Sequence, residues 1–505
     1  MHTYDILLQH VKTQPDKAVT VFEGRETSYQ HMAARSQKLG HYLKSRGLEK
    51  GDAVALLLSN SDNFVTAYFA CQAAGLVVLP VNTRLAAREL EYILNHSEAK
   101  ALIYDPEFLC VIKELAPKVS SLQEYIYTEG DNNMPGAAFE EAIRQGDEGL
   151  VSHQDEDDTA VIFYTSGTTG KPKGVMLTHR NCTSIAAMWK QAMGLQNNER
   201  VQIVAPLFHC AAAHVFMLPT LAAGATLVIE RSFSPKQALQ TLIDEKITLF
   251  FGVPAMYTLL LNLPDIQHVH APALRMLAYG AAPMPYELVK KIKQLFPQVK
   301  VQNLYGQTEN SPGATTLKDR FALDKISSVG EPLPGCQVRV ADEQGRELRP
   351  GEIGEIIVKG PHVMKGYLKN PEATARTIRD GWMFSGDLGR MEDGLLYIVD
   401  RKKDMIIRGG ENIYPIEVEE VLYEMPAVLE AAVVGTPHPL YGEVPKAYIV
   451  LKQGQSLTAD QVIHFSSERL AKYKIPAEIE FIDTLPRNAS GKILKTVLRG
   501  EISFS

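Results

Sequence analysis

Tyr164-Thr-Ser-Gly-Thr-Thr-Gly-Lys-Pro-Lys-Gly174 is a run of small and hydroxylated residues that contains two lysines, and it directly follows the apolar residues 161–163. The apolar residues predict a buried strand, and the glycines allow the chain after it to turn sharply and expose its backbone N–H groups. The hydroxyls add further donors, and the lysines add positive charge. The stretch therefore predicts a loop that binds a polyphosphate, with candidate contacts Thr165, Ser166, Gly167, Thr168, Thr169, Gly170, Lys171 and Lys173.

The spacing within this stretch differs from that of the usual P-loop. A P-loop has four residues between its two glycines, followed by Lys and Ser or Thr. Here two residues separate Gly167 from Gly170, and Pro172 follows the first lysine. We therefore expect a mobile loop that closes over phosphates. The alternative is an ordinary solvated turn, which a buried strand directly before the loop makes the weaker interpretation.

Length and composition limit the class of protein. A chain of 505 residues is too long for one ordinary core, so two or more domains are expected. Hydrophobic residues make up 45% and charged residues 22%, as in soluble globular proteins, and the net charge of −7 implies no general affinity for nucleic acid. No signal peptide or membrane-spanning stretch is expected. The five scattered cysteines lack metal spacing and suggest reduced thiols in a cytoplasm.

Strands and helices alternate along the first part of the chain. Val54–Leu58 and Leu76–Leu79 are predicted strands on either side of a predicted helix at 62–74. Ser234-Pro235 predicts another helix start, with a capping hydroxyl and a proline in the first turn. Alternation at this spacing predicts parallel sheets wrapped by helices, which is an α/β architecture.

The pattern changes after about residue 330. Short strands with Gly and Pro turns predict a small β-subdomain, and the last hundred or so residues predict a compact α+β unit with a helix at 458–472. We therefore expect a large N-terminal domain at 1–400 and a small, mobile C-terminal domain at 401–505, with a hinge near 400–404.

Three further motifs could bind parts of a nucleotide, and the first two follow predicted strands. Tyr305-Gly-Gln-Thr-Glu309 places an acid and a hydroxyl behind a glycine turn, which suits a magnesium ion that bridges phosphate oxygens, although a Thr-Glu helix cap would look the same. Gly280-Ala-Ala282 leaves room for a planar ligand close to the backbone. Asp387 ends Trp382-Met-Phe-Ser-Gly-Asp387, and its carboxylate could accept hydrogen bonds from both ribose hydroxyls.

Taken together, the ordered motifs resemble those of the adenylate-forming superfamily: acyl-CoA synthetases, luciferases and the adenylation domains of peptide synthetases. The resemblance covers nearly the whole chain, with one mild departure at Ser385, where the family pattern usually has Thr. It implies Mg²⁺ on Glu309 and Thr165 and adenine stacked on Tyr305. The remaining ATP contacts that it implies are Gly280, Ala281, Ala282, Gly306, Gln307, Thr308, Asp387, Arg401 and Lys492.

The resemblance also implies roles in catalysis. Lys492 would span the substrate carboxylate and the α-phosphate, assisted by Glu309 and Thr308, and Lys403 would be the hinge. The pantetheine arm of CoA would pass Gly409 and Gly410. The residues implied to line the acyl pocket are His209, Phe251, Gly252, Gly280 and Ala281. From the residues alone, a structural role is the favoured interpretation of His209, and a solvated basic tail is that of Lys492.

The resemblance implies an acid–CoA ligase that uses ATP and Mg²⁺, forms acyl-AMP and then transfers the acyl group to CoA. The residues of the C-terminal motifs resemble those of bacterial fatty acyl-CoA synthetases. The predicted pocket segments carry small apolar residues, which favour an apolar acid of medium or long chain. The alternatives are an aryl-CoA ligase for benzoate, cinnamate or succinylbenzoate, an enzyme that loads a carrier protein, and a nucleotide-binding regulator without catalysis. A homodimer is left open as the assembly.

Overall fold

The computed structural model describes residues 2–130, 134–150, 154–165, 172–409, 411–487 and 493–500. The chain forms two compact units. The first contains residues 1–338 and 358–384, and the second contains residues 339–357 and 385–505. The predicted domain boundary at residue 400 is also the expected hinge of a moving C-terminal domain, and it stays a prediction.

The first unit contains two sheets. The strand order of the first sheet is β19-β9-β8-β4-β3-β5-β6-β7, and that of the second is β16-β15-β14-β13-β12-β10-β11-β1-β2. The strands of the first sheet are β3 (Ala53–Leu57), β4 (Val77–Pro80), β5 (Ala101–Tyr104), β6 (Glu124–Tyr127), β7 (Ala137–Ala138), β8 (Thr159–Thr165), β9 (Lys173–Thr178) and β19 (Gly366–Tyr367). Those of the second sheet are β1 (Ala18–Phe22), β2 (Arg25–Ser28), β10 (Arg200–Ile203), β11 (Thr226–Ile229), β12 (Leu249–Gly252), β13 (Met276–Gly280), β14 (Lys300–Tyr305), β15 (Thr315–Leu317) and β16 (Ser328–Pro332).

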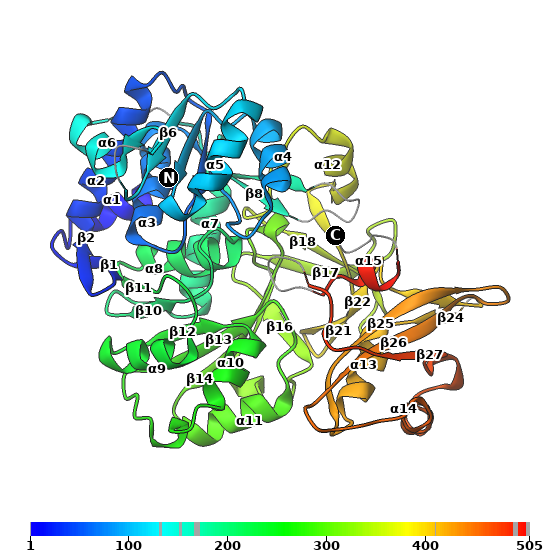
Figure 1. The fold of residues 1–505 in the computed structure, drawn as a ribbon. Coiled ribbons are helices and arrows are strands. Elements are labelled where there is room, and N and C mark those ends of the chain that lie inside the picture. The colour runs from blue at the N-terminus through cyan, green and yellow to red at the C-terminus, as the bar shows by residue number, and fades with distance from the viewer. Residues whose placement is uncertain are drawn as a thin grey trace. The chain divides into compact units, whose positions relative to one another are not determined.

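Helices cover both faces of each sheet. The core that joins the two sheets includes α1 (Asp5–Val11), α2 (Tyr29–Ser45), α3 (Asp62–Ala74), α7 (His179–Ala192) and α8 (Leu218–Ala222). The outer face of the first sheet packs on α4 (Ala87–Ser97) and α5 (Leu109–Leu115), and that of the second packs on α9 (Pro235–Asp244), α10 (Pro254–Leu261) and α11 (Tyr286–Leu295). Figure 1 shows α4 and α5 at the top of this unit, α9 to α11 at the bottom, and α7 and α8 between them. The predicted α/β fold is confirmed.

Helix α3 shows why the sequence specifies these elements so closely. The Ser61 side chain accepts a hydrogen bond from the backbone N–H of Phe64 and caps the N-terminus, and Gly75 ends the helix at a φ of 73°. The predicted helix at 62–74 is therefore confirmed. At α9 the expected proline stands in the first turn, but Ser234 makes no side-chain capping bond, so that part of the prediction is wrong.

The second unit has strands that belong to two sheets. Strands β17 (Gln337–Ala341), β18 (Gly354–Lys359), β21 (Trp382–Glu392) and β22 (Leu395–Arg401) pair in that order, and their ends at 337–338, 358–359 and 382–384 belong to the first unit. A five-stranded sheet follows, with β23 (Ile406–Arg408), β24 (Glu411–Ile413), β25 (Val428–His438), β26 (Gly442–Leu451) and β27 (Glu478–Phe481). Helices α13 (Pro415–Tyr423) and α14 (Ala459–Ser467) bury Val418, Leu422 and Val462 against this sheet. The predicted α+β character is confirmed, although α14 is shorter than the expected 458–472.

Three buried histidines make the stability of the first unit depend on pH. Burial lowers the pKa of His179 and of His362 to about 4 and that of His214 to about 3. An unfolded histidine titrates near pH 6.5, so between about pH 6.5 and 4 the unfolded chain binds more protons than the folded chain. Stability should therefore fall as pH drops through this window, by up to about 1.4 kcal/mol per pH unit for each histidine that stays neutral.

This prediction is checked by urea unfolding at pH values between 7.5 and 5, read by the fluorescence of buried Trp189. His214→Gln should make the dependence on pH less steep, whatever it does to stability at pH 7. The matched variant His464→Gln changes an exposed histidine of α14 and should leave the steepness unchanged. Equal steepness in all three proteins would contradict the assignment.

Candidate active site

The predicted phosphate loop lies within a hairpin of the first sheet. Strand β8 ends at Thr165, whose partner in the antiparallel register is Lys173, the first residue of β9. The buried strand expected before the loop is confirmed. Strand β9 was not predicted, and it makes Lys173 part of a strand instead of the loop. The candidate contacts Ser166, Gly167, Thr168, Thr169, Gly170 and Lys171 lie outside the described residues.

The motif around Glu309 begins where β14 ends at Tyr305 and turns sharply at Gly306. A Cβ on Gly306 would lie 2.5 Å from the backbone nitrogen of Gly313, so no other residue fits there without moving the backbone. The side chain of Asn310 accepts hydrogen bonds from the N–H groups of Gln307, at 2.8 Å, and Gly313, at 2.9 Å. Asn310, and not Glu309, therefore stabilises the turn, and the Glu309 carboxylate is not used as a cap.

The Glu309 carboxylate contacts a tyrosine that the sequence analysis did not single out. The Tyr367 hydroxyl donates a hydrogen bond of 2.9 Å to Oε1 of Glu309. The Lys173 ammonium lies 4.6 Å from the centroid of the same tyrosine ring. Tyr367 lies on β19, which pairs with β9. Lys173, a candidate phosphate contact, and Glu309, the acid predicted to bind Mg²⁺, thus both contact the Tyr367 side chain.

The end of the neighbouring strand β13 brings one more predicted segment to this region. Gly280, at the end of β13, pairs with Leu304 of β14, and a Cβ on Gly280 would lie 2.5 Å from the Leu304 carbonyl oxygen. Ala281 and Ala282 follow and are exposed, Ala281 with a φ of 67°. Gly280 and Tyr305 therefore lie at adjacent strand ends, where ligands of α/β proteins usually bind.

Two of the predicted acyl-pocket residues lie at the C-terminal end of β12. Phe251 and Gly252 pair with Ala278 and Tyr279 of β13. The Phe251 ring stacks on that of Phe216, with 4.4 Å between the centroids. Phe216 lies in η3 (Ala211–Met217), a π-helical turn of a kind that is frequent at functional sites. These contacts make the buried surroundings of Phe251 apolar and aromatic.

The segment that carries His209 contacts the Glu309 motif through its neighbour. Cys210 Sγ lies 3.1 Å from Thr308 Oγ1, and burial raises the pKa of the Cys210 thiol to about 12, so the thiol stays protonated. The His209 side chain is exposed, yet the protein atoms around it lower its pKa, so it is a neutral ring at pH 7. Such a ring could face an apolar substrate as well as water.

In the second unit, the predicted ribose contacts form a pair. Asp387 of β21 is buried, and its Oδ1 lies 3.5 Å from Nε of Arg401 at the end of β22. Lys403 follows in the turn after that strand. Gly409 has a φ of 58°, and its N–H donates a 2.8 Å hydrogen bond to the Tyr441 carbonyl. Gly410 and Lys492 lie outside the described residues.

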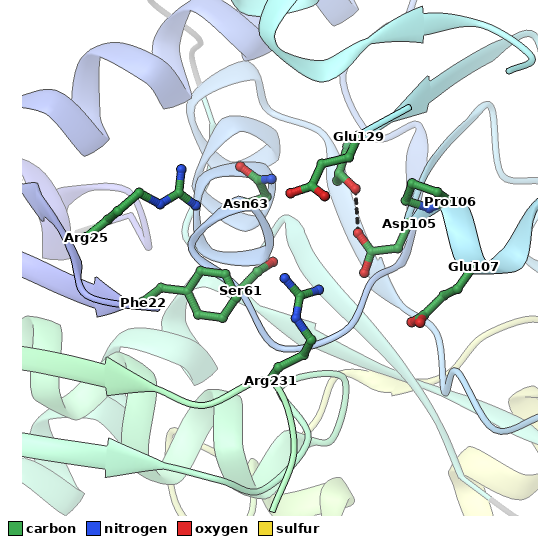
Figure 2. Close-up of a pocket in the computed structure, with 10 residues that line it drawn as sticks. Phe22, Arg25, Ser61, Asn63, Asp105, Pro106, Glu107, Glu129 and Arg231 are labelled. Carbon is green, nitrogen blue, oxygen red and sulfur yellow. Dashed lines mark hydrogen bonds between the residues drawn. The ribbon is translucent and has the colours of Figure 1, made fainter. Parts of the chain in front are cut away.

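A polar hollow of about 220 Å³ lies elsewhere in the first unit, and no predicted site residue lines it. Figure 2 shows the Arg231 guanidinium pointing into it toward Asp105, whose Oδ1 accepts a 2.6 Å hydrogen bond from the Thr128 hydroxyl. Burial raises the pKa of Asp105. Two arginines and three carboxylates line the hollow, so its charges largely compensate one another.

The described residues hold no group of three His, Cys, Asp or Glu side chains that could bind a metal by themselves. A magnesium ion here would therefore depend on a single carboxylate together with substrate phosphates, which is the usual mode for this ion. Glu309 fits that requirement, since only one of its oxygens is engaged by Tyr367 in the described part of the chain. Thr165, at the end of β8, could add a hydroxyl.

Comparison with known families decides the class of protein. Residues 7–368 match the model of the AMP-binding enzyme family, and residues 417–492 match that of the AMP-binding enzyme C-terminal domain. The chain belongs to the AMP-binding enzyme family. It is an enzyme of the acid–CoA ligase class, as its relatives are, and the predicted resemblance is confirmed.

Three relatives show the range of this AMP-binding enzyme's family. Feruloyl-CoA synthase from Amycolatopsis sp is 38% identical over 97% of each chain. A long-chain-fatty-acid–CoA ligase from Bacillus subtilis is 35% identical over 98% of this chain and 94% of its own. The structure of o-succinylbenzoate coenzyme A synthetase from Bacillus subtilis, in complex with ATP and magnesium, matches with a TM-score of 0.87 and 33% identity over 99% of each chain. No helix among the described residues is long and apolar enough to cross a membrane.

Proposed function

We propose that this enzyme uses ATP and Mg²⁺ to convert an apolar carboxylic acid into acyl-AMP, and then transfers the acyl group to CoA. The observation that carries the proposal is the meeting of Glu309 and Lys173 at Tyr367, because it joins a metal-binding carboxylate to the strand that follows the phosphate loop. Both groups are needed where a triphosphate loses pyrophosphate. The structural relative bound to ATP and magnesium supports the same reaction.

The chemistry explains why these groups are needed. A carboxylate is a poor acyl donor because its charge repels nucleophiles and its oxygen is a poor leaving group. Adenylation removes the charge and supplies a good leaving group, provided that the carboxylate is aligned with the α-phosphate and that the charge of the departing pyrophosphate is neutralised. When bound, Mg²⁺ supplies part of that neutralisation. Glu309 and Thr165 would hold it, the loop residues 165–171 and Lys173 would bind the phosphates, and Lys492 would span the carboxylate and the α-phosphate.

The nucleoside and CoA have their own proposed contacts. Tyr305 and Gly280 to Ala282 would bind adenine, with Gly306, Gln307 and Thr308 beside the phosphates, and Asp387 and Arg401 would bind the ribose hydroxyls. Gly409 and Gly410 would line the path of the pantetheine arm. Lys492 is needed in the first step and would obstruct the second, so we propose that the C-terminal domain, 401–505, moves between the steps about a hinge at Lys403.

The acid is proposed to have an apolar tail. The stacked Phe216 and Phe251, together with Gly252, Gly280, Ala281 and the neutral His209, offer no charged partner to an ammonium or a second carboxylate. A fatty acid of medium or long chain fits this lining and has the Bacillus subtilis fatty acid ligase as a precedent. An aryl acid is the second candidate, favoured by the aromatic stack and by the 38% identity with a feruloyl-CoA synthase.

The first test omits CoA. Purified enzyme, ATP, Mg²⁺ and a panel of acids should release pyrophosphate and accumulate acyl-AMP, and thioester should appear once CoA is added. Formation of ADP and phosphate instead would contradict an adenylation mechanism. Thioester formation on a carrier protein but not on CoA would support the carrier-loading alternative.

The same panel of acids also distinguishes a fatty acid from an aryl acid as the substrate. For a fatty acid pocket, each added methylene should improve catalytic efficiency by up to about 0.8 kcal/mol, roughly fourfold, until the pocket is full. Efficiency should then fall with longer acids. A flat response from acetate to laurate, with benzoate, cinnamate or ferulate far better, would identify an aryl-CoA ligase. High catalytic efficiency with succinylbenzoate would show that the preferred acid does not have an entirely apolar tail.

A further inference from the structure

Tyr367 is a buried aromatic residue whose two ends contact two different parts of the proposed site. Its hydroxyl donates to Oε1 of Glu309 at 2.9 Å, and its ring face lies 4.6 Å from the Lys173 ammonium. The tyrosine is 6% exposed, so neither contact is shared with much water. A cation over the face of a desolvated ring and a charge-assisted hydrogen bond are both stronger in such a place than at the surface.

The backbone around Tyr367 is fixed on both sides. Lys365 donates from its N–H to the Met176 carbonyl at 3.0 Å, and Tyr367 itself pairs with Val175 of β9. The N–H of Tyr367 donates to the Thr374 hydroxyl at 2.9 Å. Because the strand cannot shift without breaking these bonds, the position of the tyrosine hydroxyl is set before any ligand binds.

The same segment is tied to the backbone of the acid. The Met364 N–H donates to the Glu309 carbonyl at 2.9 Å, and the Asn181 amide of α7 donates to the carbonyls of Pro361 and Val363, each at 2.8 Å. Asn181 is itself held in a capping box at the start of α7. Glu309 is therefore anchored twice to one segment, through its carbonyl and through its carboxylate.

An ionised carboxylate only accepts hydrogen bonds, so the Tyr367 hydroxyl is the donor in its contact with Glu309.

We propose that Tyr367 is a positioning residue for the carboxylate that would bind Mg²⁺: it occupies Oε1 of Glu309, leaves Oε2 to the ion, and holds Lys173 beside the same ring. This inference rests on the proposed function, since it assigns Mg²⁺ to Glu309. Outer partners of this kind fix the orientation of a ligand, and their loss typically reduces metal affinity by about 10- to 100-fold. In this role Tyr367 would act through Glu309 and not by contact with the reacting atoms.

The test measures binding without turnover. ATP binding is followed by isothermal titration calorimetry without a carboxylic acid, in the absence of Mg²⁺, at low Mg²⁺ and at saturating Mg²⁺. Tyr367→Phe removes the hydroxyl and keeps the ring over Lys173. It should weaken ATP binding at low Mg²⁺ by about 10-fold, recover at saturating Mg²⁺, and leave metal-free binding unchanged. An equal loss under all three conditions would indicate a merely structural role and overturn the proposal.

Two comparisons make the result specific. Tyr104→Phe is the matched control, because Tyr104 is also fully buried and its hydroxyl makes one 2.8 Å hydrogen bond, to the Pro135 carbonyl. ATP binding by Tyr104→Phe should depend on the Mg²⁺ concentration in the same way as ATP binding by the original protein. In a Glu309→Gln background, Tyr367→Phe should cause little further loss, because two residues that act through one interaction are not additive. Full additivity would overturn the proposal.

The contact between the Tyr367 ring and Lys173 is tested by a separate variant. Tyr367→Leu should add a loss of metal-free ATP binding that Tyr367→Phe lacks, because only the leucine variant gives up the contact with Lys173. The original protein, assayed for acyl-AMP, tests the proposed function independently. If it forms acyl-AMP while Tyr367→Phe binds ATP normally at low Mg²⁺, the positioning role is wrong and the function stands. If it forms none, the proposed function is wrong, and with it the assignment of the ion.

Discussion

Lys492→Ala is expected to reduce acyl-AMP formation by about 100- to 1,000-fold, because a positioned charge at a reacting group is typically worth several kcal/mol in the transition state. The lysine would neutralise charge while the carboxylate oxygen attacks the α-phosphate. Thioester formation from preformed acyl-AMP and CoA has no such requirement, since the CoA thiolate attacks the acyl carbonyl and the α-phosphorus is not attacked. We therefore expect the second half-reaction to proceed at nearly the normal rate in the same variant.

The matched control is Lys472→Ala, which removes the same charge from an exposed residue of the second unit. It should leave both half-reactions unchanged. The measurement is a rapid-quench assay of each half-reaction, with pyrophosphate release for the first and AMP release for the second. If Lys492→Ala slows both steps equally, the proposed alternation of the C-terminal domain does not apply to this chain.

Much of the fold is determined by local signals that the sequence shows directly. Helix α3 begins at Ser61 and ends at Gly75 because both caps are encoded in the residues themselves. Helix α14 ends earlier than its apolar pattern suggests, and the short η7 helix, Lys472–Lys474, follows before Pro476.

The parts of the site that the sequence did not predict depend on contacts between segments that are far apart in the chain. Strand β9 pairs with β8 across the loop, and it begins with Lys173 and Gly174, whose composition is typical of a loop and not of a strand. Tyr367 lies on a strand of two residues, Gly366–Tyr367, which is too short to show any periodicity. Its partner Glu309 is 58 residues earlier, so spacing could not connect them. The local sequence Met364-Lys-Gly-Tyr-Leu368 offers no further signal than a tyrosine next to a glycine.

Gly409→Leu should have the opposite effect to Lys492→Ala. The proposed path of the pantetheine arm passes this glycine, and a branched side chain would displace the thiol from the acyl carbonyl. A misplacement of about 1 Å at a reacting group can cost about 100-fold in rate, and we expect a loss of that size in the thioester half-reaction. Acyl-AMP formation should be nearly unchanged, because the glycine has no proposed role in that step.

Gly409→Ala provides the control that separates obstruction from backbone strain. Gly409 has a φ of 58°, so any side chain there incurs a left-handed strain of roughly 1–2 kcal/mol. A Cβ would lie 3.5 Å from Cδ1 of Tyr441, which is ordinary contact, so alanine fits and pays the same strain as leucine. The thermal midpoints of the two variants should therefore be similar, while thioester formation falls sharply in the leucine variant alone. Equal loss in both would mean that strain in the β23–β24 turn, and not a blocked path, limits the second step.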